Sequence, residues 1–288
     1  MRLNSLMILL VVVLTRVNAQ DLPAYKIYSS EGKPSDYSKM IDGAAEAGIV
    51  FVGELHNNSI AHWLELKITE SIYAENSELV LAMEMFEADD QIVLTEYLDN
   101  VIKEDHLLKE AKVWNNYKTD YKPLVEFARK NQLPVIASNI PRRYANLVYR
   151  QGLSSLDSLT SEAKQWIAPL PIKIDLELPG YKSMIAMMGS HGDGDPNNIA
   201  FAQAVKDATM AHFILQNKTL SNKILHFNGS YHSQNHEGIV WYIKQSRPDL
   251  KVITIQLLEQ KDISTLDNDN LGKADFIIVI PSDMTKTY

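Results

Sequence analysis

The stretch Ile49-Val50-Phe51-Val52-Gly53-Glu54-Leu55-His56 decides the fold that we expect of this chain. A short, unbroken apolar run that ends in a glycine is typical of a buried strand entering a turn. A second stretch, Ile224-Leu225-His226-Phe227-Asn228-Gly229-Ser230-Tyr231-His232, repeats the order, so both copies carry Gly-x-x-His after a strand. Ligands of open α/β sheets bind outside the carboxyl ends of the strands. The two copies therefore predict one shared site for a metal, haem or acid/base chemistry.

After a polar leader (20–40), short apolar runs alternate with longer segments of helical period. We expect strands at residues 49–53, 79–84, 134–138, 224–229, 251–257 and 275–280. Helices between them are indicated by apolar residues at helical spacing, as in Ile60, Leu64, Ile68 and Ile72, with Asn58 or Ser59 as the cap. The alternation predicts an α/β fold with a mainly parallel central sheet and helices on both faces.

Residues 141–222 interrupt this alternation because they hold no convincing strand. We expect a helix after Pro141, a proline-rich stretch, a glycine-rich loop and a long helix around 196–217. An insertion of this length is commonly a lid or a binding subdomain. The sequence thus predicts a single domain over 20–288, with a helical insertion (lid) subdomain at about 141–222.

The start of the chain is typical of a secretory signal peptide. Arg2 precedes an apolar run from Leu6 to Leu14, which is too short for a membrane span, and small residues lead to Ala19. We expect residues 1–19 to be removed, and the mature protein to be exported, periplasmic or secreted, without a transmembrane segment.

Composition argues against several classes of protein. The formal net charge of −8 is unlike that of a nucleic-acid binder, which usually shows a basic face. The sequence has no cysteine, which excludes disulfides, thiolate metal ligands and the lipid-carrying cysteine of a lipoprotein.

Carboxylates and histidines gather at the predicted strand ends. Glu54 and His56 follow the first strand, and His62 comes in the first turns of the next helix. Such a group either ligates a divalent ion or supplies a base and an acid. Glu84 ends the second strand, where a buried charge must be paired or reach solvent. We take His56, His232, Glu54 and His62 as candidate metal ligands, and Glu54, His56 and Glu84 as the catalytic candidates of an enzyme.

The segment after the third strand offers a positive site. Pro141 is well placed to begin a helix, and Arg142 and Arg143 lie in its first turn. Guanidinium groups beside free helical N–H groups can receive a carboxylate, a phosphate or haem propionates. The alternative is that one arginine pairs structurally with Glu84 or Glu87.

Four further residues are candidates for contact with a cofactor. Tyr117 belongs to an aromatic cluster, Tyr231 lies in the second Gly-x-x-His, His212 lies on the inward stripe of the long helix, and His191 lies in the glycine-rich loop. Tyrosine and histidine can both be axial ligands of haem. Each of these side chains has a plainer alternative, as a core or solvated loop residue.

Six segments in order resemble the ChaN family of iron-regulated haem-binding proteins, within the group that also includes Tiki, TraB and the erythromycin esterases. They are VFVGELHNN with His62, LVLAMEMFE, WNNYKTDYKPLVEFA, LPVIASNIPRR, FAQAVKDATMAHFI and FNGSYHSQNHEGI, and they span about residues 40–260.

The resemblance implies an exported haem-binding protein that takes part in haem or iron acquisition. Haem held between the protomers of a homodimer and an outer-membrane haem or iron uptake receptor are the partners it implies. The Tiki relatives imply instead a metal-dependent peptidase, in which His56, His232, Glu54 and Glu84 serve a divalent ion whose bound water attacks a carbonyl. The esterase relatives imply metal-free acid/base work by Glu54 and His56. We therefore expect haem binding first, with a hydrolase as the alternative.

Overall fold

The computed structural model describes residues 21–188 and 195–288, and its centre is an eight-stranded sheet in the order β2-β1-β8-β7-β3-β6-β4-β5. The strands are β1 (Lys26–Ser29), β2 (Pro34–Ser35), β3 (Ile49–Glu54), β4 (Leu79–Glu87), β5 (Val135–Asn139), β6 (Lys223–Gly229), β7 (Val252–Gln260) and β8 (Phe276–Pro281). All pairs from β8 across to β5 are parallel. The mainly parallel sheet and the six expected strands are confirmed.

The polar leader holds structure that the sequence pattern does not reveal. Strand β1 pairs antiparallel with β2 and with β8 at one edge of the sheet. Only Ile27 and Tyr28 of its four residues are buried, and the Tyr28 hydroxyl donates to the Ile263 carbonyl at 2.6 Å. A strand this short carries too few alternations to be recognised, and its pairing with β8 depends on residues far along the chain.

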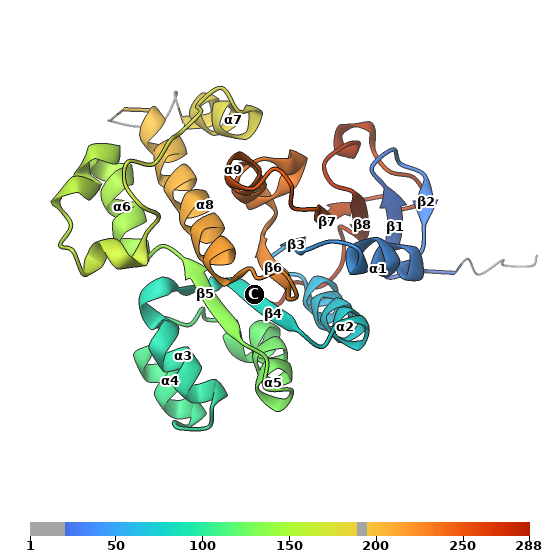
Figure 1. Cartoon of the computed structure of the whole chain (residues 1–288). Coiled ribbons are helices and arrows are strands. Elements are labelled where there is room, and N and C mark those ends of the chain that lie inside the picture. The colour runs from blue at the N-terminus through green and yellow to red at the C-terminus, as the bar shows by residue number, and fades with distance from the viewer. Residues whose placement is uncertain (1–20, 189–194) are drawn as a thin grey trace, which may run out of the picture.

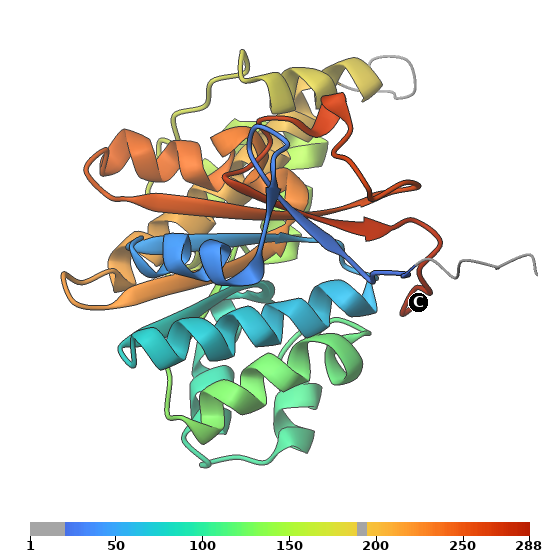
Figure 2. The same ribbon diagram turned by 90° about the vertical axis from the view of Figure 1, so that its right-hand side faces the viewer.

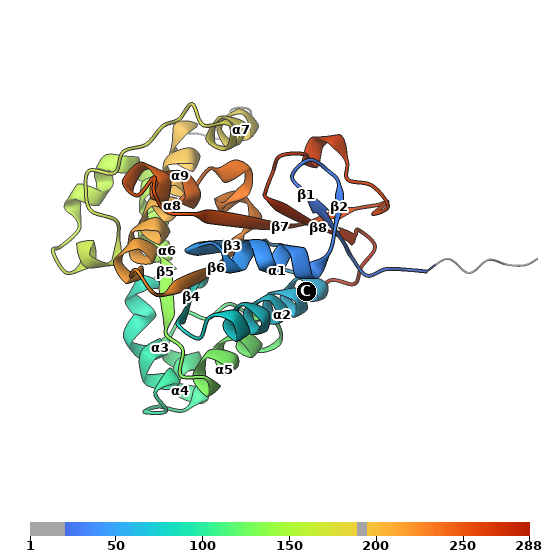
Figure 3. The same cartoon turned by 45° about the vertical axis from the view of Figure 1, so that its right-hand side comes forward.

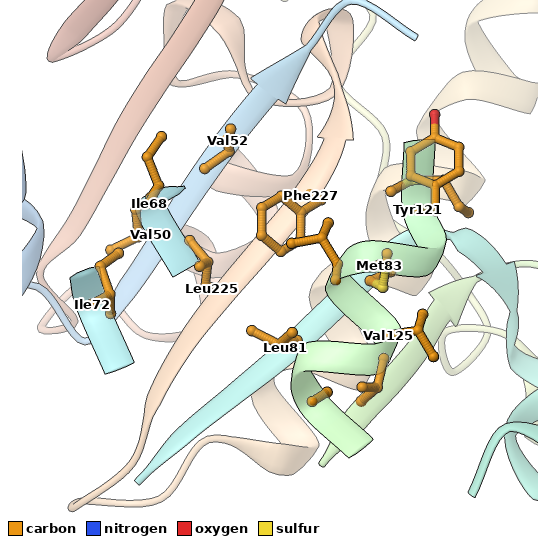
Figure 4. Close-up of a cluster of buried hydrophobic side chains, with 14 of the residues drawn as sticks. Val50, Val52, Ile68, Ile72, Leu81, Met83, Tyr121, Val125, Leu225 and Phe227 are labelled. Atoms are coloured by element: carbon orange, nitrogen blue, oxygen red, sulfur yellow. The ribbon is translucent and has the colours of Figure 1, made fainter. Parts of the chain in front are cut away.

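Helices cover both faces of the sheet (Figures 1 and 2). Helices α1 (Tyr37–Ala45), α2 (Ser59–Glu75) and α5 (Lys122–Lys130) pack on one face, and α8 (Asn197–Asn217) and α9 (Ile239–Ser246) on the other. Successive residues of a strand point to opposite faces, so Val50 and Val52 join the first core while Ile49 and Phe51 join the second. Figure 4 shows the first core, including Phe227.

The described part of the segment between β5 and β6 is helical and contains no strand. It includes α6 (Arg142–Gln151), α7 (Pro179–Met188) and α8, and Val148 of α6 and Val205 of α8 share a separate core. Helices α3 (Gln91–Leu98) and α4 (Glu104–Glu110) complete the fold beside α5. Among the described helices, none has the length and apolar character needed to cross a membrane.

The start of α2 fixes the position of the residues behind the first Gly-x-x-His. Asn58 is the N-cap, as expected, and its side-chain oxygen accepts from the N–H groups of Ile60 and Ala61 at 3.0 and 3.1 Å. A cap of this kind stabilises a helix by about 1 kcal/mol. It sets the rotation of α2 so that His62 and Glu65 lie on its buried face.

Candidate functional site

Strand β6 lies between β3 and β4 (Figure 3). A cleft lies at the carboxyl ends of these three strands. Glu54 pairs in register with Gly229, and Met83 with Phe227, so the two motif ends and Glu84 lie at one level. The cleft has a volume of about 1470 Å³. Its lining includes Glu54, His56, Glu84, Trp114, Arg142, Arg143, Met184, Gln203, Lys206, Tyr231, His232 and Tyr288. The two Gly-x-x-His copies thus share one site.

Both motif glycines have a side chain packed directly on them. A Cβ atom at Gly53 would lie 2.4 Å from Oε1 of Gln256, and one at Gly229 would lie 2.6 Å from Nε2 of His56. Real Cβ atoms do not come this close to other atoms. The histidine of the first motif therefore packs against the glycine of the second.

The first arm of the site consists of Glu54 and His56. Glu54 is only 1% exposed, and its Oε1 accepts from Nδ1 of His56 at 2.9 Å and from the Tyr121 hydroxyl at 3.1 Å. Burial, helped by the neighbouring Glu65 carboxylate, raises the pKa of Glu54 to about 8 against the opposing effect of the histidines. The His56 ring is partly exposed and stacks edge-on to Trp114. Glu54 thus holds one side of an imidazole that borders the cleft.

Behind the first arm lies a buried cluster made of Glu54, His62, Glu65 and Asp120. Nδ1 of His62 is 3.1 Å from Oε2 of Glu65 and 3.3 Å from Oε2 of Glu54. Its Nε2 is 3.1 Å from the His56 carbonyl oxygen and 3.4 Å from Oδ2 of Asp120. Burial also raises the pKa of Glu65 to about 8. His62 is therefore close to Glu54, as expected, but it lies beneath the first arm and does not line the cleft.

The second arm is a chain of charged groups built from Glu84, His232 and Asp207. Nε2 of His232 is 3.1 Å from Oε1 of Glu84, and its Nδ1 donates to Asp207. The outer oxygens of both carboxylates are also satisfied, because Gly229 N–H donates to Glu84 and the Tyr181 hydroxyl donates to Asp207, each at 2.7 Å. The ring of His232 is thus fixed between two carboxylates.

This arrangement keeps the Glu84–His232 pair ionised, while burial raises the pKa of Asp207 against the opposing charge of His232. Burial would lower the pKa of His232, but the negative charges of Glu84 and Asp207 prevail and raise it to about 10. Burial would raise the pKa of Glu84, but the His232 imidazolium and the Gly229 N–H hold it well below its usual range. At neutral pH the second arm therefore presents an imidazolium paired with a carboxylate.

The two arginines of the predicted anion site both line the cleft, but only one is paired. Arg143 contacts Asp89 at 2.6 Å and lies over the Tyr144 ring. Arg142 is exposed and makes no ion pair with any described residue. The expected alternative, pairing with Glu84 or Glu87, is not what the structure shows for Arg143.

The other cofactor candidates are separated by the structure. Tyr231 lines the cleft and is 64% exposed. Tyr117 is buried in the core against Phe86 and does not line the cleft, and burial raises its pKa. His212 lies half-buried beside Phe213 on the flank of α8, away from the cleft lining, and burial lowers its pKa. His191 lies outside the described residues.

The sequence did not indicate three carboxylates of the site, which are Glu65, Asp120 and Asp207. Glu65 and Asp207 are fully buried on the inner faces of α2 and α8, where Leu64 and Ala208 are their neighbours. A charged residue among apolar ones on the inner face of a helix is costly unless it is paired. A carboxylate on an otherwise apolar helix face is the sequence feature that could have identified Glu65 and Asp207.

Comparison with known proteins now gives these residues a context. The family model described as "Haem-binding uptake, Tiki superfamily, ChaN" matches residues 40–243. The chain belongs to this family. No match is found among curated proteins for this ChaN-family chain.

Solved structures share the fold of this ChaN-family protein at low sequence identity. One is ChaN of Campylobacter jejuni with cofacially bound haem, with 17% identity, a TM-score of 0.65, and 90% of this chain and 97% of that chain covered. Another is the erythromycin esterase EreC in its open conformation, with 12% identity, a TM-score of 0.52 and coverages of 89% and 97%. A Bacillus cereus protein has 12% identity, a TM-score of 0.52 and coverages of 90% and 95%.

Proposed function

We propose that this ChaN-family protein binds haem in the cleft between the two arms. The observation that carries the proposal is the exposed tyrosine, Tyr231, on a cleft of about 1470 Å³ in a chain of a haem-binding uptake family. Pockets for small ligands usually measure about 300–1,000 Å³, so this cleft has room for a flat macrocycle. Tyrosine oxygen is an established axial ligand of haem iron.

The rest of the lining supports the same ligand. Trp114 and Met184 supply apolar surface, which suits a porphyrin ring. Arg142 and Lys206 line the cleft without an ion pair to any described residue, so their charges are available to the two propionates. Arg143 already serves Asp89 and is assigned a smaller part.

The biological setting is part of the proposal. The Campylobacter jejuni relative binds haem cofacially. We assign this chain a homodimer in which two open clefts bring haem groups face to face, with Tyr231 of each copy at the contact. Export to the periplasm or beyond, a part in haem or iron acquisition, and delivery from an outer-membrane uptake receptor follow as its proposed place in the cell.

A haem titration followed by absorbance tests the proposal. We expect a saturable Soret shift in the wild-type protein, and an affinity at least about tenfold lower in Tyr231→Phe, equivalent to about 1.4 kcal/mol. Tyr149→Phe is the matched control, because Tyr149 is an exposed tyrosine that does not line the cleft. Sedimentation with and without haem checks the dimer. An unchanged Soret band in Tyr231→Phe would remove this residue as the ligand, and no saturable shift in the wild type would overturn haem binding.

A hydrolase is the second candidate, favoured by the facing arms. Nδ1 of His56 is held by Glu54, which leaves its Nε2 beside Gly229 to accept a proton from water. Both ring nitrogens of His232 are held by Glu84 and Asp207, so the guanidinium of Arg142, which lines the same cleft, would stabilise negative charge on a carbonyl oxygen. We expect His56→Ala to abolish any ester or peptide hydrolysis, while His106→Ala, at an exposed histidine outside the cleft lining, leaves it intact. Hydrolysis that survives in His56→Ala would exclude this mechanism.

A further inference from the structure

The buried cluster behind the first arm contains polar atoms that no protein group satisfies. Oε2 of Glu54 and Oε1 of Glu65 are buried and lack a hydrogen-bond partner, and the second oxygen of Glu65, Oε2, has Nδ1 of His62 as its partner; both residues are no more than 1% exposed. A buried carboxylate oxygen without a hydrogen-bond donor destabilises the folded protein, and a second carboxylate beside it increases the penalty. Asp120 has hydrogen-bond partners, because its Oδ2 accepts from the side chains of Asn116 and Thr287.

The imidazole in this cluster is oriented as a metal ligand would be. Both groups within reach of Nε2 of His62 are acceptors, namely the His56 carbonyl oxygen and the Asp120 carboxylate, so an N–H at Nε2 has partners and Nδ1 can serve as the ligand. Nδ1 then faces the carboxylates of Glu54 and Glu65. A metal-bound histidine characteristically donates its other N–H to a carbonyl or carboxylate in this way.

The spacing of the three inward atoms also fits an ion. The distances from Nδ1 of His62 to Oε2 of Glu65 and of Glu54 are 3.1 and 3.3 Å. A tetrahedral ion with bonds of about 2.0–2.1 Å separates its ligands by about 3.3 Å. Ligand atoms from Glu54, His62 and Glu65 all lie within 4.8 Å of one another, as one shared ion requires.

We propose that Glu54, His62 and Glu65 bind one divalent first-row ion of the Zn²⁺ class in the layer beneath the cleft. One imidazole and two carboxylates suit such an ion better than Mg²⁺ or Ca²⁺, which prefer oxygen ligands alone. Glu54 also lines the cleft, so the ion would lie directly beneath it. The ion uses Oε2 of Glu54 and leaves Oε1 to hold His56, so this site does not depend on haem binding.

Metal analysis and titration with Zn²⁺ test the proposal. After dialysis without chelator, we expect the wild-type protein to retain one Zn²⁺ per chain. Loss of a second-shell partner typically weakens a site by about 10–100-fold, so loss of a ligand in Glu65→Gln or His62→Gln should cost at least about 100-fold. Glu84→Gln is the matched comparison, because it neutralises a buried carboxylate of the second arm, and we expect it to keep the ion.

A second probe guards against misfolding. Co²⁺ in the wild-type protein should give visible absorption bands that Zn²⁺ displaces, and Glu65→Gln should lose these bands. Chelator-treated Glu65→Gln should melt no lower than chelator-treated wild type, because the substitution removes repulsion between two carboxylates. No saturable Zn²⁺ binding in the wild type would overturn the proposal and indicate a proton shared by Glu54 and Glu65. Binding lost in Glu84→Gln but kept in Glu65→Gln would overturn it by placing the ion in the cleft.

Discussion

The two arms of the site carry the same motif but hold their charges in opposite ways. In the first arm, burial and a neighbouring carboxylate raise the pKa of Glu54 to about 8, so its charged form is disfavoured. In the second arm, His232 has a pKa of about 10 and the pKa of Glu84 is lowered. Behind the first arm, Glu65 and Asp120 add further carboxylates around His62. In the second arm, hydrogen-bond donors contact both carboxylates. The partners supplied by other elements decide what a Gly-x-x-His turn does.

The largest expected difference comes from removing each histidine. His232→Leu leaves Glu84 and Asp207 buried without their shared cation, which should cost about 3–5 kcal/mol in the free energy of unfolding. His56→Leu removes a partly exposed ring with one hydrogen bond to Glu54 and should cost less than about 1.5 kcal/mol. Urea unfolding measures both. Equal losses would contradict the contrast between the arms.

The pH dependence of the second arm gives the next largest effect. The pKa of His232 is raised above its unfolded value of about 6.5, so its stabilisation is fully present below about pH 6.5 and is lost as the pH rises through about 10. Asp207→Asn removes one of the two charges that raise this pKa, so the loss should begin at lower pH, by about 1–2 units. NMR titration of the His232 ring reports the pKa directly. A wild-type ring that titrates near pH 6.5 would show that the arm is not held ionised.

Contact between the arms can be broken at Gly229. The methyl group of Gly229→Ala would lie 2.6 Å from Nε2 of His56 and displace the ring. We expect the free energy of unfolding to fall by about 1–3 kcal/mol. In a His56→Ala background the obstructing ring is gone, so the same substitution should cost much less. A double-mutant cycle by urea unfolding measures this difference. Additive losses of unfolding free energy would mean that the two arms are not in steric contact.

The smallest effect compares two buried tyrosines, one for each arm. Tyr181 donates to Asp207 at 2.7 Å, and Tyr121 donates to Glu54 at 3.1 Å. The shorter hydrogen bond is the stronger of the two, so Tyr181→Phe should destabilise the protein by about 0.5–1 kcal/mol more than Tyr121→Phe. Thermal unfolding of the two variants at pH 6 checks this order. The reverse order would indicate that the longer hydrogen bond to Glu54 contributes more to stability.

The sheet and the two motifs could be predicted because their signals are local. Each central strand is an unbroken apolar run, and Glu54, His56, Glu84 and His232 follow directly from strand ends that a parallel sheet brings to one edge. Asn58 could be recognised as a cap for the same reason, since it bonds to the helix that it precedes.

The remaining partners could not be placed because their roles depend on tertiary contacts. Asp207 reaches His232 only because α8 packs on the face of the sheet, and Asp120 reaches His62 only through the π-helical turn Tyr117–Tyr121 before α5. Tyr117 and His212 have residue types suited to a cofactor, but an aromatic or a helical stripe does not tell which side of a helix faces a cleft. Burial of polar residues on apolar faces would have been the better guide.

The position of β6 between β3 and β4 governs the order in which the molecule can be completed (Figure 3). Strands β3 and β4 precede β6 by more than a hundred residues of chain, so each keeps an unpaired hydrogen-bonding edge until β6 enters the slot. Pairing over such separations is slow, and open apolar edges favour association between chains. The same strand carries Gly229 and leads into His232, so an incompletely folded chain has no site at all. The site therefore forms only in molecules whose sheet has closed.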